Sequence, residues 1–392
     1  MPTYPTYKLG EIIDKVPIEF KVKQKEYLPK GKFPVVDQGQ PLIGGYTDDE
    51  TLLVKTELPV IVFGDHTKVK KFVDFPFVAG ADGTKIIKPK KDYFIEPKLF
   101  YWFLHCVKFP DKGYARHFQY LLKSDIAVPP LPTQHAIVSR IETLFAELDK
   151  AVQHLRTAQQ QLKTYRQAVL NHWLNNEDGR WETVKLGEVA EKIFDGPFGT
   201  HLKSDDYVSS GIRVVRLENI KAGYFDDSKQ SYVTPEKYEI IKRHTVYPTD
   251  LIMSTFISEK VKVCQMPKHI EFAVNKADCI GIRLKPLANN DFIKYYLSLR
   301  SVYHQLEIQV HGATRPRVNT TQIKNIEINL PPLAEQQRIV AEIESRLSQA
   351  STSSAYIENA LQQAEALRQS ILKKAFSGEL VVSTSSTTSK GG

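Results

Sequence analysis

Two copies of one motif organise the chain: PPLPTQHAIVSRIE at residues 129–142 and PPLAEQQRIVAEIE at residues 331–344. The copies lie 202 residues apart, and the same separation continues beyond the motif, where Arg166-Gln167 matches Arg368-Gln369. A repeat at a fixed separation indicates that one structural unit occurs twice. Each PPL therefore opens a segment of the same length and of related structure.

Both segments are predicted to be long helices. No proline or glycine occurs in residues 133–175 or 334–377, and both segments are rich in the helix formers Ala, Gln, Leu, Glu and Arg. Apolar residues recur at alternating steps of three and four, which is the spacing of a coiled-coil seam. The predicted seam residues are Ile141, Leu144, Leu148, Val152, Leu155, Leu162, Tyr165 and Val169, then Ile343, Leu347, Ile357, Leu361, Ala364, Leu367 and Ile371.

A second repeated string, KLGE, opens each half at Lys8–Glu11 and Lys185–Glu188, with a separation of 177 residues. Weaker echoes follow at 196 residues, between Ala81-Asp82 and Ala277-Asp278, and at 198 residues, between Phe94-Ile95 and Phe292-Ile293. The separation thus grows from 177 to 202 residues between KLGE and PPL. Two copies of one fold would give this drift if the second copy carried 25 additional residues in its loops.

The parts between these markers have a mixed α+β pattern. Short apolar runs such as Val60–Phe63 and Ile280–Leu284 predict strands, while residues 97–107 and 291–307 predict helices. The fold class is therefore α+β: two domains of short strands and helices, joined by two long antiparallel coiled-coil helices in a pseudo-twofold tandem repeat. The predicted boundaries are 1–132, 133–175 for the central helix, 176–332, 333–377 for the C-terminal helix, and a disordered Ser/Thr-rich tail at 378–392.

Composition favours a polyanionic partner. The net charge is +8 and the isoelectric point about 9.0. The three cysteines, Cys106, Cys264 and Cys279, are odd in number and unpatterned, which argues against disulfides and a zinc site. No signal peptide and no run of about 18 apolar residues is present. We expect a soluble, cytoplasmic protein without a membrane association.

The motifs of DNA-modifying enzymes are missing from the sequence. There is no GxxxxGK[ST] phosphate loop, no Asn-Pro-Pro-aromatic or Asp-Pro-Pro-Tyr string, and no glycine-rich loop for a methyl donor. Asp14 with Glu19-Phe20-Lys21 imitates a nuclease triad only faintly, and a solvated charged edge explains it better. The 11 histidines show no metal-ligand spacing. The chain is predicted to have no catalytic residue, no metal and no cofactor of its own.

The repeated KLGE and PPL strings, together with ILKKAFSGEL at residues 371–380, resemble the specificity subunits of Type I restriction-modification systems. The resemblance covers nearly the whole chain, and PPLAEQQRI and AFSGEL are its most specific pieces. VIVFGDHTKVKKF, DGPFGTHLKSDDY and HGATRPRVN also resemble strings from the target recognition domains of that family.

This resemblance implies a non-catalytic subunit that reads an asymmetric, bipartite double-stranded DNA target through two target recognition domains. It also implies two methyltransferase subunits, which use S-adenosylmethionine, and two restriction subunits, which translocate and cut DNA with ATP and Mg²⁺. Duplex DNA and these four subunits are the expected partners.

Polar residues of four loops are predicted to contact DNA, because Arg, Lys, Asn and Ser/Thr side chains read base edges or bind phosphates. A solvated surface role is the alternative for each. The candidates are His66, Thr67, Lys68, Tyr114, Arg116 and His117 in the first domain, and Lys203, Ser204, Thr314, Arg315, Arg317 and Asn319 in the second. The candidates for binding partner subunits on the helices are Gln134, Ile137, Ile141, Gln336, Ile339 and Ile343.

Two other classes of function remain open at this point. One is a DNA methyltransferase or nuclease, which the missing motifs disfavour. The other is a coiled-coil scaffold outside restriction-modification, with or without DNA binding. The two domains diverge in sequence while the helices keep their register, which favours separate recognition tasks over a pure scaffold.

Overall fold

The structure is a computed structural model that describes residues 4–110, 116–175, 179–257, 259–310 and 316–380. The chain forms two compact units: residues 1–156 with 358–392, and residues 157–357. The division falls inside two long helices, so each unit contains one mixed-sheet domain and a part of both helices. From residue 381 onward, the predicted tail lies outside the described residues.

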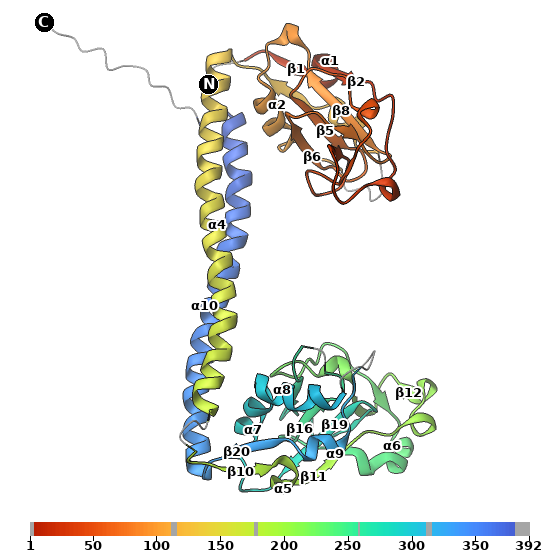
Figure 1. Cartoon of the computed structure of the whole chain (residues 1–392), viewed down its shortest axis with the longest axis vertical. Helices are drawn as coiled ribbons and strands as arrows, with labels where there is room; N and C mark the ends of the chain where they lie inside the picture. Colours follow the sequence, from red (N-terminus) through yellow and green to blue (C-terminus); the bar gives the residue numbers. More distant parts are fainter. Residues whose placement is uncertain (1–3, 111–115, 176–178, 258, 311–315, 381–392) are drawn as a thin grey trace, which may run out of the picture. The chain divides into compact units, whose positions relative to one another are not determined.

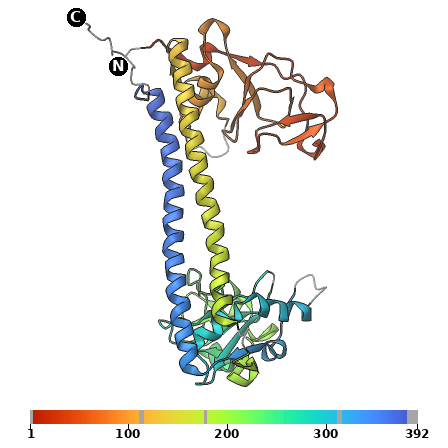
Figure 2. The same ribbon diagram turned by 60° about the vertical axis from the view of Figure 1, so that its left-hand side comes forward.

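The two repeated segments are helices of 44 residues each, α4 (Leu131–Leu174) and α10 (Leu333–Phe376). Helix α4 begins two residues before the predicted residue 133 and includes Pro132. Proline is tolerated in a first turn, where its missing N–H would have no helical partner. In each unit the two helices run side by side and antiparallel (Figures 1 and 2).

Equivalent apolar residues hold the helices together in each unit. In the first unit Ile137, Val138, Ile141 and Phe145 of α4 pack with Ile371, Leu372 and Ala375 of α10. In the second unit Ile339, Val340 and Ile343 of α10 pack with Val169, Leu170 and Leu174 of α4. The predicted antiparallel packing is therefore confirmed.

The predicted seam is wrong at two equivalent positions, Tyr165 and Leu367, which are 39% and 50% exposed. The neighbouring arginines make the contacts between the helices instead. In the first unit the Arg368 guanidinium pairs with Asp149 and lies over the Phe145 ring. In the second unit Arg166 donates to the Ser351 hydroxyl at 3.2 Å.

The described residues of the first domain form three small sheets. A four-stranded antiparallel sheet has the order β2-β8-β5-β6, and a three-stranded sheet has the order β4-β3-β7 with β3 and β7 parallel. A third sheet pairs β1 with β9. The elements are β1 (Thr6–Lys8), α1 (Leu9–Ile12), β2 (Ile13–Val16), β3 (Phe33–Val36), β4 (Gly45–Thr47), β5 (Val60–Gly64), β6 (Lys70–Val73), β7 (Val78–Ala79), β8 (Thr84–Pro89), α2 (Pro97–Leu104), α3 (Phe118–Leu122) and β9 (Asp125–Ala127).

The second domain repeats this topology with additions. Its four-stranded sheet has the order β11-β19-β16-β17, β10 pairs with β20, and β14-β13-β18 again contains a parallel pair. The elements are β10 (Glu182–Lys185), α5 (Leu186–Val189), β11 (Ala190–Phe194), β12 (Tyr207–Val208), β13 (Ile212–Val215), β14 (Tyr232–Val233), α6 (Pro235–Ile241), β15 (Thr245–Val246), β16 (Leu251–Ser254), β17 (Val263–Gln265), β18 (Ala273–Asn275), β19 (Cys279–Leu284), α7 (Asn290–Leu297), α8 (Arg300–Glu307), α9 (Thr320–Lys324) and β20 (Glu327–Leu330).

The additional residues of the second copy form the helices α6 and α8, which have no α-helical counterpart in the described part of the first domain, whereas the edge strands β12 and β15 correspond to the single bridges Leu28–Tyr46 and Leu53–Val78. Helix α8 corrects the prediction of one helix over residues 291–307. The echo between Phe94 and Phe292 is misaligned, because Leu287 holds the place of Phe94 before helix α7. We call two positions equivalent when they occupy the same place in this shared topology.

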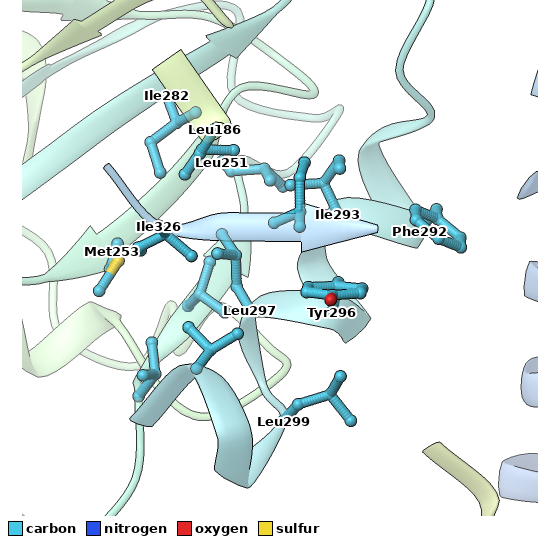
Figure 3. Packing of buried hydrophobic residues seen from close by; sticks show 14 of the residues in the cluster. Leu186, Leu251, Met253, Ile282, Phe292, Ile293, Tyr296, Leu297, Leu299 and Ile326 are labelled. Carbon is cyan, nitrogen blue, oxygen red and sulfur yellow. The ribbon is translucent and has the colours of Figure 1, made fainter. Parts of the chain in front are cut away.

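The core of the second unit joins the sheet, helix α7 and the long helices. Leu186, Leu251, Met253 and Ile282 face Ile293 and Leu297 of α7 in Figure 3, and all six are fully buried. Strands such as β5 (VIVFG) are buried at every position, which explains their continuous apolar sequence. These cores fix the loops at the ends of the strands.

Candidate nucleic-acid interface

Each domain is anchored to its long helix by a buried glutamine. The Gln134 side chain accepts from the Glu96 amide at 2.8 Å and donates to the carbonyls of Phe94 and Pro129 at 3.0 and 2.7 Å. Gln336 makes the equivalent contacts with Asn289, Leu287 and Pro331, at 2.7, 3.1 and 2.8 Å. Both glutamines are buried, so each completes a junction within the chain.

The six helix residues predicted to bind partner subunits need a correction for the same reason. Gln134 and Gln336 are 1% and 0% exposed, and the four isoleucines are buried between the helices and the domains. A side chain buried in its own unit cannot present a surface to another subunit. The corrected residues are Gln134, Ile137, Ile141, Gln336, Ile339 and Ile343.

KLGE is likewise a structural string. Leu9 and Leu186 are fully buried, and their amides donate to the carbonyls of Ser124 and Ile326 at 2.9 and 2.8 Å. A Cβ added to Gly10 would lie 3.2 Å from the Leu122 carbonyl oxygen, and the equivalent Gly187 is as close to Lys324. The repeated glycine therefore permits a close approach of two segments.

In the first domain Asp65 gathers three loops into one polar edge. Its amide donates to the Gly83 carbonyl at 2.9 Å, and its carbonyl accepts from the His117 amide at 2.8 Å. Its carboxylate accepts from the Phe118 amide, also at 2.8 Å. The β5–β6 hairpin, the β7–β8 connection and the segment before α3 thus meet at this residue. We call this meeting place the first edge.

Several predicted DNA contacts lie on the first edge. The Thr67 hydroxyl donates to the Gln38 carbonyl at 2.7 Å, and Lys68 adopts a φ of 60° at the tip of the hairpin, beside His66. Arg116 is exposed next to this hairpin. Tyr114 lies outside the described residues. The structure therefore brings His66, Thr67, Lys68 and Arg116 together, although they come from two distant segments.

His117 does not belong to the exposed edge. It is 0% exposed, packs against Phe109 and Tyr120, and its ring nitrogens have no hydrogen-bond partner among the described residues. The equivalent residue of the second domain is the buried Val318. We therefore correct the prediction: His117 fills a core position.

The residues Asp37 and Gln38 complete the first edge and were not predicted. The Gln38 side chain donates to the Asp82 carbonyl at 2.6 Å and accepts from the His66 amide at 3.4 Å. The Asp37 carboxylate lies 3.5 Å from the Lys71 ammonium and 3.0 Å from the Tyr27 hydroxyl. Burial, then the Asp37 charge, raises the pKa of Tyr27, while burial lowers that of Lys71. Asp37 thus supports the loop that carries Gln38.

The second domain builds an equivalent second edge around Thr255. Its amide donates to the Asp278 carbonyl at 3.0 Å, and its carbonyl accepts from the Val318 amide at 2.9 Å. These contacts match those of Asp65, so Val318 is equivalent to His117. Arg317 and Arg116, which directly precede these two residues, are therefore equivalent as well. Arg317 lies 3.5 Å from the Asp278 carboxylate and over the Phe256 ring.

The other predicted residues of the second domain have different positions. Asn319 caps helix α9, because its side chain accepts from the Gln322 amide at 2.9 Å. Lys203 and Ser204 are exposed before strand β12, where the Lys203 amide donates to Asp206 at 2.6 Å. None of their described contacts reaches Arg317. Thr314 and Arg315 lie outside the described residues.

Two further cations near the second edge were missed. Arg216 follows β13 as Asp37 follows β3, and Lys276 follows β18. Both lie over the Tyr207 ring, with 5.5 and 5.3 Å to its centroid. A buried acid in one domain and a cation in the other therefore occupy equivalent positions. The two edges share a backbone frame and differ in charge.

In the described part of the chain, no helix has the length and apolar character of a membrane span. Over the same residues, no group of three or more His, Cys, Asp or Glu side chains is arranged to hold a metal ion.

The chain is similar to a known protein family. Residues 179–363 match the model of the Type I restriction modification DNA specificity domain. The Type I restriction enzyme EcoKI specificity subunit of Escherichia coli is 28% identical over 65% of this chain, and that match spans only 58% of the relative's length. The EcoR124I/EcoR124II specificity subunit of the same species is 25% identical, with 85% of this chain and 84% of the relative covered.

Solved structures share the fold. One, described as "Structural basis underlying complex assembly and conformational transition of the type I R-M system", has a TM-score of 0.73 at 19% identity and covers 97% of this chain and 99% of that one. The HsdS subunit from Thermoanaerobacter tengcongensis has a TM-score of 0.54 at 20% identity, covering 97% and 98%. The predicted α+β architecture with long antiparallel helices is confirmed.

Proposed function

Because the chain belongs to the family of Type I restriction-modification DNA specificity subunits, we propose that its two domains read the two halves of a bipartite duplex DNA target. The chain is the specificity subunit of such an enzyme and is itself non-catalytic. The first and second edges are the reading surfaces of the two domains.

One observation carries this proposal: the edges have the same backbone frame and different side chains. The amide and carbonyl contacts of Asp65 recur at Thr255, whereas Gly83 is replaced by Asp278 and Asp37 by Arg216. A shared frame presents each edge to the duplex in the same way. Different side chains then select different bases, so we expect an asymmetric target.

Arg116 and Arg317 are the residues best suited to contact DNA. Arginine reads guanine in the major groove with two hydrogen bonds, or clamps a phosphate. Both arginines are exposed. Each directly precedes a buried residue, His117 or Val318, whose amide donates to the backbone of the edge. In the first domain Gly83 stands at the position of Asp278 and has no side chain to pair with Arg116. The two arginines thus present the same group in different electrostatic settings.

The catalytic steps belong to partner subunits in this proposal. Two methyltransferase subunits would use S-adenosylmethionine, and two restriction subunits would use ATP and Mg²⁺. A tandem repeat offers equivalent binding sites to two copies of one partner.

The test is to sequence methylated adenines in cells that express the chain with its methyltransferase subunit. We expect one new motif with two different half-sites and a spacer of unspecified bases. A continuous or palindromic motif would contradict bipartite reading by two different edges. No new methylation, from subunits shown to be assembled, would contradict the proposed function itself.

A further inference from the structure

Large apolar side chains are exposed at equivalent positions of the two units. Phe94 and Leu287 each offer a carbonyl oxygen to the junction glutamine, and their side chains are 69% and 47% exposed. Leu131 and Leu333 begin the long helices and are 39% and 38% exposed. The first unit thus carries Phe94 with Leu131, and the second carries Leu287 with Leu333. We call each set a junction pair.

The two members of a junction pair are fixed to each other. Gln134 holds the carbonyls of Phe94 and Pro129 with one amide group, and Leu131 follows Pro129 closely in the chain. Gln336 holds Leu287 and Pro331 in the same way. Because the backbone segments that carry the two residues are held together, little backbone entropy is lost when another surface covers them.

The junction pairs differ from single exposed residues because two apolar residues recur as a set in each copy. Single exposed apolar residues are ordinary on protein surfaces, and Ile240 and Ile308, which are 69% and 77% exposed, are of this kind. Ile240 lies in helix α6 and Ile308 directly follows α8, both of which are additions of the second domain. The junction pairs instead recur in both copies, at places where the surrounding contacts are the same.

The backbone at Phe94 supports this reading. Its φ is 47°, a left-handed conformation that is unfavourable for a bulky side chain. Contacts within the unit do not compensate for it, because most of the ring is exposed. An external contact for the ring would explain why an aromatic residue stands there.

Charged groups lie close in the chain to Phe94 and Leu287, and their hydrogen bonds recur in both units. The Lys90 ammonium donates to the Glu11 carbonyl at 2.7 Å, and the Lys285 ammonium donates to the Glu188 carbonyl at 2.8 Å. The carboxylates of these two glutamates come from the repeated KLGE string and are exposed. An apolar centre with a polar rim is the usual composition of a protein–protein interface.

The repetition also identifies the kind of partner. Protein–DNA interfaces are polar and strongly basic, which the junction pairs are not, and the DNA-reading edges differ between the domains while the junction pairs recur. We propose that each junction pair is the docking point for one copy of the same protein. Under the function proposed above, on which this inference rests, that protein is the methyltransferase subunit.

The test compares three variants of the full chain with the purified methyltransferase subunit: F94S/L131S, L287S/L333S and the combination of all four substitutions. Native mass spectrometry and titration would measure the copies bound and their affinities. We expect two copies on the unmodified chain. Each double variant should keep one tight site and weaken the other about tenfold to hundredfold, and the fourfold variant should lose both tight sites.

The matched control is I240S/I308S, which removes two exposed apolar residues that have no repeat counterpart and should leave both sites unchanged. Circular dichroism would establish that every variant retains its helices. If the fourfold variant still bound two copies with unmodified affinity, the junction pairs would not be the docking points, and the proposed function would stay intact. An unmodified chain that bound no methyltransferase subunit would overturn the proposed partner, and the docking points with it.

Discussion

The junctions and the edges of this chain differ in how closely the two copies agree. At the junctions, Gln134 and Gln336 each make three hydrogen bonds to equivalent groups. At the edges, the backbone contacts of Asp65 and Thr255 agree, whereas the side chains around them differ in size and charge. Backbone hydrogen bonds hold the frame, so the exposed side chains can change without disturbing it. Under the proposed function, this separation would let one scaffold read two different half-sites.

The largest effect should come from the junction glutamines. Substitution of Gln134 by Ala leaves a buried amide and two carbonyls without partners, which should reduce the free energy of unfolding by about 2–4 kcal/mol. Gln336→Ala should cost a similar amount in the second unit. Hydrogen exchange would assign each loss to its unit. Gln161→Ala, on the exposed surface of α4, is the control and should change stability by less than about 0.5 kcal/mol. Strongly unequal losses of unfolding free energy in the two variants would contradict the equivalence of the two junctions.

The stability of the two units should depend differently on pH. Burial, with the charges of Lys70 and Arg368, lowers the pKa of His105 to about 4, and Ser298 holds the equivalent place after α7. The neutral imidazole is favoured in the folded state, so folding loses stability as pH falls from about 6.5 toward 4. At pH 4.5 the loss should be about 2–3 kcal/mol relative to pH 7.

The pH prediction is checked by the slope of unfolding free energy against pH. His105→Gln should flatten that slope for the first unit over this interval, whatever its effect at pH 7. The second unit should keep its own slope. An unchanged slope in the first unit would show that His105 is not the group responsible.

The equivalent arginines of the edges should have comparable effects on DNA binding. Arg116→Ala and Arg317→Ala should each weaken binding by about 1–3 kcal/mol, as measured by fluorescence anisotropy with the assembled methyltransferase at two salt concentrations. Lysine at either position distinguishes a phosphate contact from base recognition. It can still bind a phosphate, but it cannot make the two hydrogen bonds by which arginine recognises a base. Full affinity and selectivity in both alanine variants would place these arginines outside the interface.

The smallest effect should come from the contact between the helices. Asp149→Ser would give the first unit the partner that Arg166 has in the second, and Ser351→Asp would make the reverse change. Each should alter stability by only about 0.2–1 kcal/mol, with a loss in the first case and a gain in the second. Chemical denaturation at low and high salt would measure both. A gain in stability of Ser351→Asp that persists at high salt would contradict its origin in a partly exposed ion pair with Arg166.

Much of the frame was predictable from the sequence because the frame is what repeats. The separation of 202 residues after each PPL predicts equal helices, and both have 44 residues. Periodicity could not show that Tyr165 and Leu367 face outward, because a long arginine can replace an apolar residue between two helices. A polar residue such as Gln134 suggests a surface, and only its distant partners Glu96 and Phe94 make it a core residue.

The edges were less predictable. Loop composition identified Thr67, Lys68 and Arg116, but Gln38 and Asp65 act through contacts with segments 44 and 53 residues away. No local pattern indicates such contacts. For His117 the prediction failed in the opposite direction. This polar residue lies in a polar stretch of sequence, yet it is buried at the position equivalent to Val318.

The most direct test of separate reading uses the chain's own second domain. Residues 9–124 would be replaced by residues 186–326, which join the same strand pair at equivalent positions. The duplicated chain would be expressed with the methyltransferase subunit, and methylated adenines would be sequenced. We expect a target whose two halves are inverted copies of the half-site read by the second domain. Retention of the original asymmetric target by a folded, assembled protein would contradict separate reading.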